Sequence, residues 1–193
     1  MPRYIALLRA INVGGHVVKM DRLRTLFEEL GFSDVSTFIA SGNVLFETPS
    51  KDVAAIATQI EEHLMQALGY DVVTFIRTPK QVEKIAELQP FPATEVDVAG
   101  TGLYVGFLCK APAPSAREKL MKLCSKENEF RVREREVYWL VRTTLSDSSF
   151  SGSKMERVLG MPMTMRNITT VQKLAALPAA ATMAPAKKPS AAL

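Results

Sequence analysis

Apolar runs and helical stripes alternate along the first 77 residues in an order that predicts six elements. Two segments carry apolar residues at helical spacing, which predicts helices capped by Asp21 and by Ser50. Their apolar stripes are Leu23, Leu26, Phe27 and Leu30, then Val53, Ile56, Ile60 and Leu64. Strands are predicted at residues 3–10, 35–40, 44–48 and 72–77. The predicted order is strand, helix, strand, strand, helix, strand, or βαββαβ.

A third helix is predicted directly after this unit. Thr78 is a favourable N-cap residue, Pro79 suits the first helical turn, and Gln81 can complete a capping box. Pro90 ends the helix, because a proline ring clashes with the preceding turn and lacks a backbone N–H. Residues 90–101 are therefore expected to be a linker between two subdomains.

The same order of elements returns after residue 101. Strands are predicted at residues 103–109, 128–133, 136–142 and 163–166. The two middle strands form a hairpin with the charged turn Glu134-Arg135. Helices are predicted from Ser115, which can form a capping box with Glu118, over residues 153–160, and after Asn167.

This order predicts an α+β fold of two ferredoxin-like (βαββαβ) subdomains, and therefore a duplicated architecture. The first subdomain and its following helix span residues 1–89, and the second, with a C-terminal helix, spans residues 102–177. The duplication rests on element order alone, because the halves share little sequence identity. Residues 178–193 are rich in Ala and Pro, with almost no large apolar groups to bury, so we expect a flexible tail.

Composition restricts the class of protein. Apolar residues make up 47% of the chain, which is enough for a core. No stretch approaches the roughly 18 apolar residues of a membrane span, and the N-terminus lacks a signal-peptide layout, so we expect no membrane partner. Two cysteines, Cys109 and Cys124, fit a reduced protein without a disulfide framework, and we expect a cytoplasmic location.

Charge and metal-ligating residues argue against two further classes of protein. The net charge is +4, and without Lys187 and Lys188 the balance is 22 basic against 20 acidic residues, or +2. Such a balance is not typical of a nucleic-acid-binding protein. His16 and His63 are the two histidines, and neither stands at ligand spacing from a cysteine. We therefore expect no metal site and no cofactor.

Polar residues gather at three places where predicted strands or helices end. Arg9, Asn12 and Gly14-Gly15 follow the first strand, and backbone N–H groups of such a loop can bind an anion. Ser41-Gly42-Asn43 forms the tip of the first hairpin. The third group surrounds the last two helix starts, where arginine suits a phosphate or carboxylate; it comprises Ser153, Lys154, Thr164, Arg166 and Asn167. Ordinary turn and capping roles are the alternative for each group.

A second candidate surface is the strand pair within EFRVREREVYWLVR. Arg131 and Arg133 share one strand face, and Tyr138 and Trp139 lie on the partner strand. Basic residues interleaved with aromatic residues can bind single-stranded nucleic acid. A solvated outer face, with Glu134 offsetting the charge, is the alternative.

The segments IALLRAINVGGH, FIASGNVLF and SGSKMERVLG with TMRNITTVQKL resemble the bacterial family named domain of unknown function 1697. Its members carry an LLRGINVGG opening, an SGN hairpin, and SK-L and TTRNWNTV segments. The resemblance covers residues 3–177. It implies a duplicated ferredoxin-like α+β architecture and no known activity, cofactor or catalytic residue.

The family pattern selects the same polar positions. They are Arg9, Asn12, Gly14, Gly15, Ser41, Gly42, Asn43, Ser153, Lys154, Thr164, Arg166 and Asn167. This chain departs from the pattern at Ala10, Met165, Ile168 and Thr169, where the family has Gly, Thr, Trp and Asn. An aromatic stacking role at position 168 is therefore not expected.

These observations lead to one main hypothesis and its alternatives. The main hypothesis is binding of a phosphate-bearing or other anionic ligand between the two halves, by the twelve positions above. The alternatives are a nucleic-acid-binding module that uses the basic sheet face, a small transferase or hydrolase built on the same pocket, and a scaffold without a ligand. Whether the protein is an enzyme, and which residues would be catalytic, stays open.

Overall fold

The first half of the chain forms one antiparallel sheet covered by two helices. A computed structural model describes residues 1–144, 148 and 150–183. The sheet has the strand order β2-β3-β1-β4. Its elements are β1 (Arg3–Leu8), α1 (Met20–Glu29), β2 (Ser33–Phe38), β3 (Asn43–Glu47), α2 (Val53–Leu68) and β4 (Thr74–Arg77). Tyr4, Ala6 and Leu8 of the central strand β1 pack in the core beneath α1 and α2.

The second half forms another four-stranded antiparallel sheet, with the corresponding order β6-β7-β5-β8. Its elements are β5 (Gly102–Leu108), α5 (Pro114–Met121), β6 (Asn128–Arg133), β7 (Glu136–Val141), α6 (Gly152–Leu159) and β8 (Met163–Asn167). Trp139 is fully buried under α5 and α6, and its Nε1 donates to Asn128 Oδ1 at 2.9 Å. The described residues thus form a mixed α+β fold with two sheets and seven helices.

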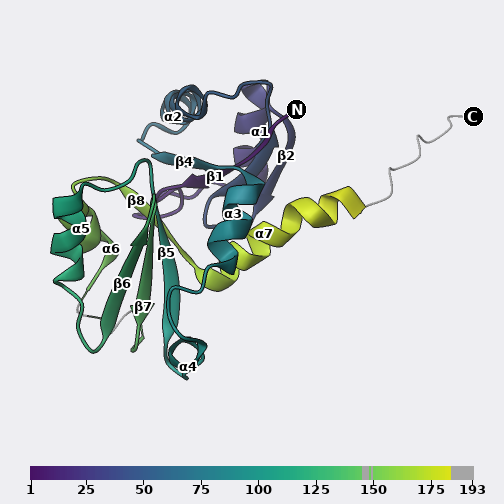
Figure 1. Ribbon diagram of the computed structural model, residues 1–193. Helices are drawn as coiled ribbons and strands as arrows, with labels where there is room; N and C mark the ends of the chain where they lie inside the picture. The colour runs from purple at the N-terminus through teal and green to yellow at the C-terminus, as the bar shows by residue number, and fades with distance from the viewer. Residues whose placement is uncertain (145–147, 149, 184–193) are drawn as a thin grey trace, which may run out of the picture.

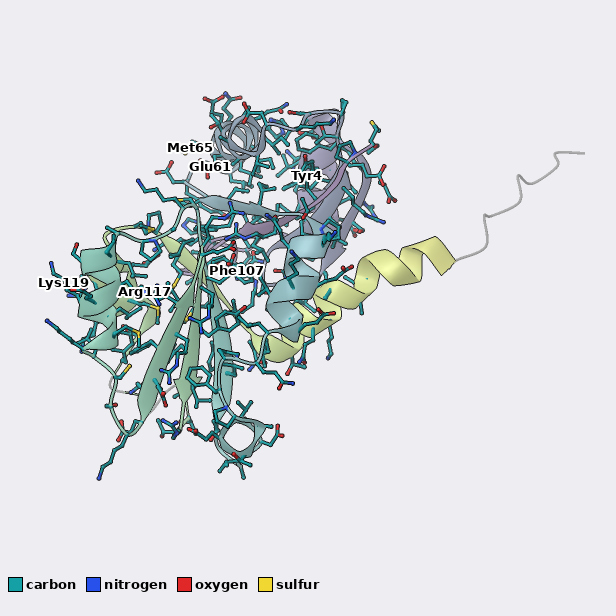
Figure 2. All side chains as sticks on the ribbon, in the orientation of Figure 1. Tyr4, Glu61, Met65, Phe107, Arg117 and Lys119 are labelled. Atoms are coloured by element: carbon teal, nitrogen blue, oxygen red, sulfur yellow. The ribbon has the colours of Figure 1, made fainter. Side chains whose placement is uncertain are left out.

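A third core joins the two halves. Ile5 and Leu7 on the second face of β1 pack with Val105 and Phe107 of β5 in this shared core. Helices α3 (Pro79–Glu87) and α7 (Ile168–Met183) lie side by side at this junction, and the short α4 (Ala93–Val96) precedes β5 (Figure 1). Figure 2 shows Phe107 near the centre of the molecule, between the halves. Burial on both faces explains why the central strands are continuous apolar runs.

Three predicted helix caps are wrong, and two are confirmed. Lys19 and Ala113 precede α1 and α5 without a side-chain cap, so neither Asp21 nor Ser115 has that role. The cap of α2 is Asp52, whose Oδ1 accepts from the N–H groups of residues 54 and 55, and Ser50 lies two residues too early. The confirmed caps are Thr78, which forms the predicted capping box with Gln81, and Asn167, whose Oδ1 accepts from Thr169 N at 2.9 Å. The backbone conformation before the first turn decides the cap, and residue type alone leaves several candidates.

The C-terminal boundary also differs from the prediction. Helix α7 continues to Met183, so the predicted flexible tail from residue 178 begins too early. The helix runs through Pro178, which disfavours a helix interior, and the three alanines that follow at 179–181 have the highest helix propensity. The rest of that predicted tail, residues 184–193, lies outside the described residues. Over the described part of the chain, no helix combines the length and apolarity that a membrane crossing requires.

Candidate functional site

A hollow of about 670 Å³ lies where the two halves meet at the end of β1, and we name it the junction hollow. From the first half it is lined by the loop after β1 and the β2–β3 turn. From the second half it is lined by the first turns of α6 and by β8. The lining residues are Leu8–Val13, Ala40 and Ser41, and then Gly152, Ser153, Glu156 and Met163–Arg166.

Arg166 is the central charged residue of the junction hollow. Its side chain reaches from β8 into the first half, and only 7% of the residue is exposed. All its hydrogen-bond acceptors are uncharged. They are Asn43 Oδ1 (2.7 Å), Thr164 Oγ1 (2.9 Å) and the carbonyl oxygens of Leu8, Ser41, Gly42 and Met165. Burial lowers the pKa of Arg166 to about 10, and no ion pair is formed by this guanidinium within the described residues.

Arg9 and Glu156 form an ion pair across the same hollow. Arg9 donates from Nε and Nη2 to the two carboxylate oxygens of Glu156 at 2.7 and 3.0 Å. Glu156 Oε1 also accepts from the backbone N–H of Met163 at 2.8 Å. Burial alone would raise the pKa of Glu156, but the hydrogen bonds from Arg9 and Met163 outweigh it and hold the pKa below its usual value. This pair is neutral overall, so Arg166 supplies the net charge of the hollow.

The structure brings half of the predicted site residues together. Those that line the junction hollow are Arg9, Asn12, Ser41, Ser153, Thr164 and Arg166. Asn12 is already engaged, because its Nδ2 donates to Val18 O and Ala40 O and its Oδ1 accepts from Val18 N. Gly42 and Asn43 do not line the hollow, but both accept hydrogen bonds from Arg166. Asn43 accepts through its side-chain Oδ1, and Gly42 accepts through its carbonyl oxygen.

The other four predicted residues lie outside the junction hollow. Gly14 and Gly15 are exposed in a turn with φ of +70° and +91°, which explains the glycines by backbone conformation. Lys154 Nζ lies over the ring of Phe150, 5.2 Å from its centroid. Asn167 caps α7. They were grouped with the others because they belong to the same sequence segments as residues that line the hollow.

The basic sheet face differs from its prediction. Tyr138 and Trp139 are buried, at 1% and 0% exposure, so neither ring is open for base stacking. Arg131 lies over the ring of Phe91 and is paired with Glu129. The alternation of aromatic and basic residues on this hairpin therefore reflects burial on both faces of the sheet.

Two features of the junction were missed by sequence reasoning. One is Glu156, which lies one helical turn after Ser153; this spacing was a signal for a shared helix face. The other is the buried ion pair of Arg77 on β4 with Glu136 on β7, 2.8 Å from Nε to Oε1. Its partners are 59 residues apart, and neither residue carries a local signal for the contact.

Arg77 and Arg166 occupy corresponding positions and cross between the halves in opposite directions. Arg77 pairs with Ile5 in the first sheet, as Arg166 pairs with Val105 in the second. Arg77 Nη2 donates to Leu108 O at 2.8 Å, and Arg166 Nη2 donates to Leu8 O at 3.1 Å. Each arginine also binds the hairpin turn of the other half.

The correspondence extends to the acceptors, but the charges differ. Asn43, which accepts from Arg166, pairs with Leu7; Glu136, which accepts from Arg77, pairs with Phe107 at the matching register. The position that follows β1 is Arg9, and the position that follows β5 is Cys109. The Arg77–Glu136 pair is therefore neutral, whereas Arg166 retains its positive charge.

No group of three or more His, Cys, Asp or Glu side chains within the described residues is arranged to hold a metal ion. His16 stacks on Tyr70 with ring centroids 3.8 Å apart, and Tyr70 OH donates to Ile11 O. These contacts anchor the loop after β1. His63 contacts Glu29 at the surface.

Comparison with known proteins places the chain in a family. No curated protein matches it. The structure of conserved bacterial protein SP0830 from Streptococcus pneumoniae is similar with a TM-score of 0.68 at 23% identity, over 92% of this chain and 98% of that chain, which shows a shared fold. The family model described as "Protein of unknown function (DUF1697)" matches residues 1–138. The chain belongs to the DUF1697 family.

Proposed function

We propose that the protein binds a small anionic ligand, phosphate-bearing or carboxylate, in the junction hollow. The observation that carries the proposal is the buried guanidinium of Arg166, which lines the hollow and is solvated by neutral dipoles alone. The corresponding Arg77 has the carboxylate of Glu136 as its partner. An anion in the hollow would supply a compensating negative charge to Arg166, as the carboxylate of Glu136 does to Arg77.

The energetic reason is the cost of an isolated buried charge. Removal of a cation from water costs several kcal/mol unless an opposite charge compensates it. Two unit charges about 4 Å apart attract each other by about 4 kcal/mol at an effective dielectric constant of about 20. The donors of Arg166 are already engaged, so its contribution to binding is charge, and the hydrogen bonds come from other groups.

Those other groups stand on both sides of the junction hollow. Ser41 Oγ accepts from Asn43 Nδ2, so its own hydroxyl proton is directed to another acceptor. Ser153 lies in the first turn of α6 with its hydroxyl 3.0 Å from that of Ser151. Arg9 holds Glu156 with Nε and Nη2, and its Nη1 makes neither of these bonds. A ligand between these three groups would contact both halves.

We also propose that the two halves are duplicated ferredoxin-like units. Both have the order βαββαβ and corresponding antiparallel strand orders, which supports this finer interpretation of the fold. The reciprocal arginines support it from side-chain geometry, independently of sequence identity. Cys109 and Cys124 are free thiols, which supports our proposal of a reducing, cytoplasmic location.

Thermal unfolding with inorganic phosphate, phosphate esters and carboxylates tests the proposed function. A ligand at 100 times its Kd should stabilise the fold by about 2.7 kcal/mol. Arg9→Gln should remove the response, because it leaves Glu156 unpaired and negative beside the ligand. Lys154→Gln is the matched control, since it removes one positive charge from a residue outside the hollow. An equal response of the two variants, or no response of the wild type to any anion, contradicts the proposal.

A further inference from the structure

A second hollow, of about 280 Å³, lies between α3 and the β6–β7 hairpin, and we name it the hairpin hollow. Its wall on α3 is formed by Gln81, Lys84, Ile85 and Leu88, whose spacing places them on one helix face. Its wall on the hairpin is Arg133–Glu136. The hollow also has Arg77 and Tyr138 in its lining, and it shares no lining residue with the junction hollow.

The floor of the hairpin hollow is fixed and neutral. The side chains of Arg77 and Glu136 are 1% and 9% exposed, and they compensate each other through their ion pair. The hydroxyl of Tyr138 donates to Ile85 O at 3.1 Å, so β7 and α3 are joined directly beneath the hollow. The side chains of the rim therefore decide which charge the hollow prefers.

The rim carries an excess of positive charge. Lys84, Arg133 and Arg135 contribute three cations, and within the described residues none of them forms an ion pair with a carboxylate. Glu134 contributes one negative charge, so the rim has a net charge of +2. Gln81 adds an oriented donor, because its Oε1 accepts from Thr78 N and leaves its Nε2 for another partner.

One wall of the hairpin hollow is apolar. Ile85 is buried below it, and Leu88 is one of the large hydrophobic side chains that the surface leaves open, at 37% exposure. Inorganic anions gain nothing from such a wall, whereas an apolar ring or chain placed against it is removed from water. The combination of a cationic rim with an apolar wall is typical of sites for amphipathic anions.

We propose that the hairpin hollow is a second binding site, which takes a small organic anion with an apolar body and a phosphate or carboxylate group. The acidic group lies among Lys84, Arg133 and Arg135, and the apolar body lies against Ile85 and Leu88. The proposal does not depend on ligand binding in the junction hollow, because the two sites have separate residues. Both halves contribute here as well, since α3 follows the first sheet and the hairpin belongs to the second.

Isothermal titration with 1-naphthyl phosphate tests this site, with 1-naphthol and inorganic phosphate as matched probes. The wild type should bind 1-naphthyl phosphate more tightly than either matched probe. Lys84→Gln and Arg133→Gln should each weaken binding by about tenfold, the usual effect of one charge-assisted hydrogen bond. Lys80→Gln is the matched control, because Lys80 is an exposed lysine of the same helix outside the hollow.

A third variant tests the contribution of the apolar wall to binding. Leu88→Ser should weaken 1-naphthyl phosphate and leave the affinity for inorganic phosphate unchanged. Binding that Lys84→Gln and Arg133→Gln leave unchanged overturns the proposal, as does a wild type that binds inorganic phosphate equally well. If Arg9→Gln abolishes binding and the hairpin variants do not, the probe occupies the junction hollow and the second site is refuted. The proposal is also refuted if the protein binds single-stranded RNA more tightly than 1-naphthyl phosphate and the same hairpin variants weaken that RNA binding.

Discussion

The Nε of Arg166 on β8 donates to Asn43 Oδ1 on β3 over 2.7 Å, between residues 123 positions apart in the chain. At the corresponding position of the other junction, the Nε of Arg77 donates to a carboxylate oxygen of Glu136 over 2.8 Å. Two arginines in matching registers thus join the halves, and one of them has an amide where the other has a carboxylate. Because of this difference of one functional group, the Arg77 contact is neutral and the Arg166 contact retains a net charge.

Asn43→Asp should convert the charged junction into a copy of the neutral one. A carboxylate at position 43 would compensate the charge of Arg166, but it would lose the two hydrogen bonds that Asn43 Nδ2 donates to Phe38 O and Ser41 Oγ. The affinity for anions in the junction hollow should fall by at least about tenfold, or about 1.4 kcal/mol. Titration of the thermally stabilising anion measures this loss. Asn167→Asp is the control, because it makes the same chemical change at a helix cap that accepts Asp equally well.

Glu136→Gln should be strongly destabilising. It leaves Arg77 buried without its carboxylate, and removal of one partner of a buried ion pair typically costs about 3–5 kcal/mol. Urea unfolding of the two proteins gives the difference in free energy. Glu134→Gln removes a neighbouring carboxylate that is exposed, and its effect should stay within about 0.5 kcal/mol. Equal stability of both variants would contradict the assignment of Arg77 and Glu136 as a structural pair.

The Arg9–Glu156 pair should make stability depend on pH in the acid range. Burial opposes the shift, but the hydrogen bonds from Arg9 and Met163 hold the folded pKa of Glu156 below its unfolded value of about 4.3. Its contribution is therefore present above pH 4.3 and is lost as the pH falls through the folded pKa. Glu156→Gln should lower the free energy of unfolding by about 1 kcal/mol near pH 7, a small effect because Arg9 is partly exposed to solvent. Below about pH 4 the loss should become progressively smaller, because Glu156 is then protonated in the wild type.

Urea unfolding at several pH values checks this dependence. Glu62→Gln is a suitable control, because Glu62 is an exposed carboxylate of α2. A difference between Glu156→Gln and the wild type that stays constant from pH 7 to pH 3 would refute the role of the ion pair.

Gly42→Ala should be destabilising through both backbone and packing. Gly42 has φ of +75°, and a Cβ there would lie 2.6 Å from Ile11 Cγ2 and 3.0 Å from Leu8 Cβ. Gly14 has a similar φ of +70°, with nothing within 4 Å of its added Cβ. Gly14→Ala should therefore cost about 1 kcal/mol from backbone strain, and Gly42→Ala at least about 1 kcal/mol more. Urea unfolding separates the two, and equal losses would show that packing at Gly42 is unimportant.

Local features of the fold could be predicted from the amino-acid sequence alone. The capping box of Thr78 and Gln81 and the hairpin at Glu134-Arg135 were predicted because their signals lie within a few residues of one another. The order βαββαβ in both halves followed from apolar periodicity, which reflects burial on one or both faces of each element. Arg9, Ser41, Ser153 and Arg166, which were candidate site residues from the sequence, line one hollow, and their role toward a ligand stays a prediction.

The contacts of those polar residues depend on how the two halves pack together. Arg166 and Asn43 were both predicted as ligand contacts, but they bind each other, and Asn12 is engaged within its own loop. The partner of a buried polar group is chosen by which strands face each other across the shared core, and such contacts join residues 59 to 123 positions apart. Nothing local in a sequence encodes that choice. The net charge of each junction, and with it the candidate site, therefore emerges only when both halves are packed together.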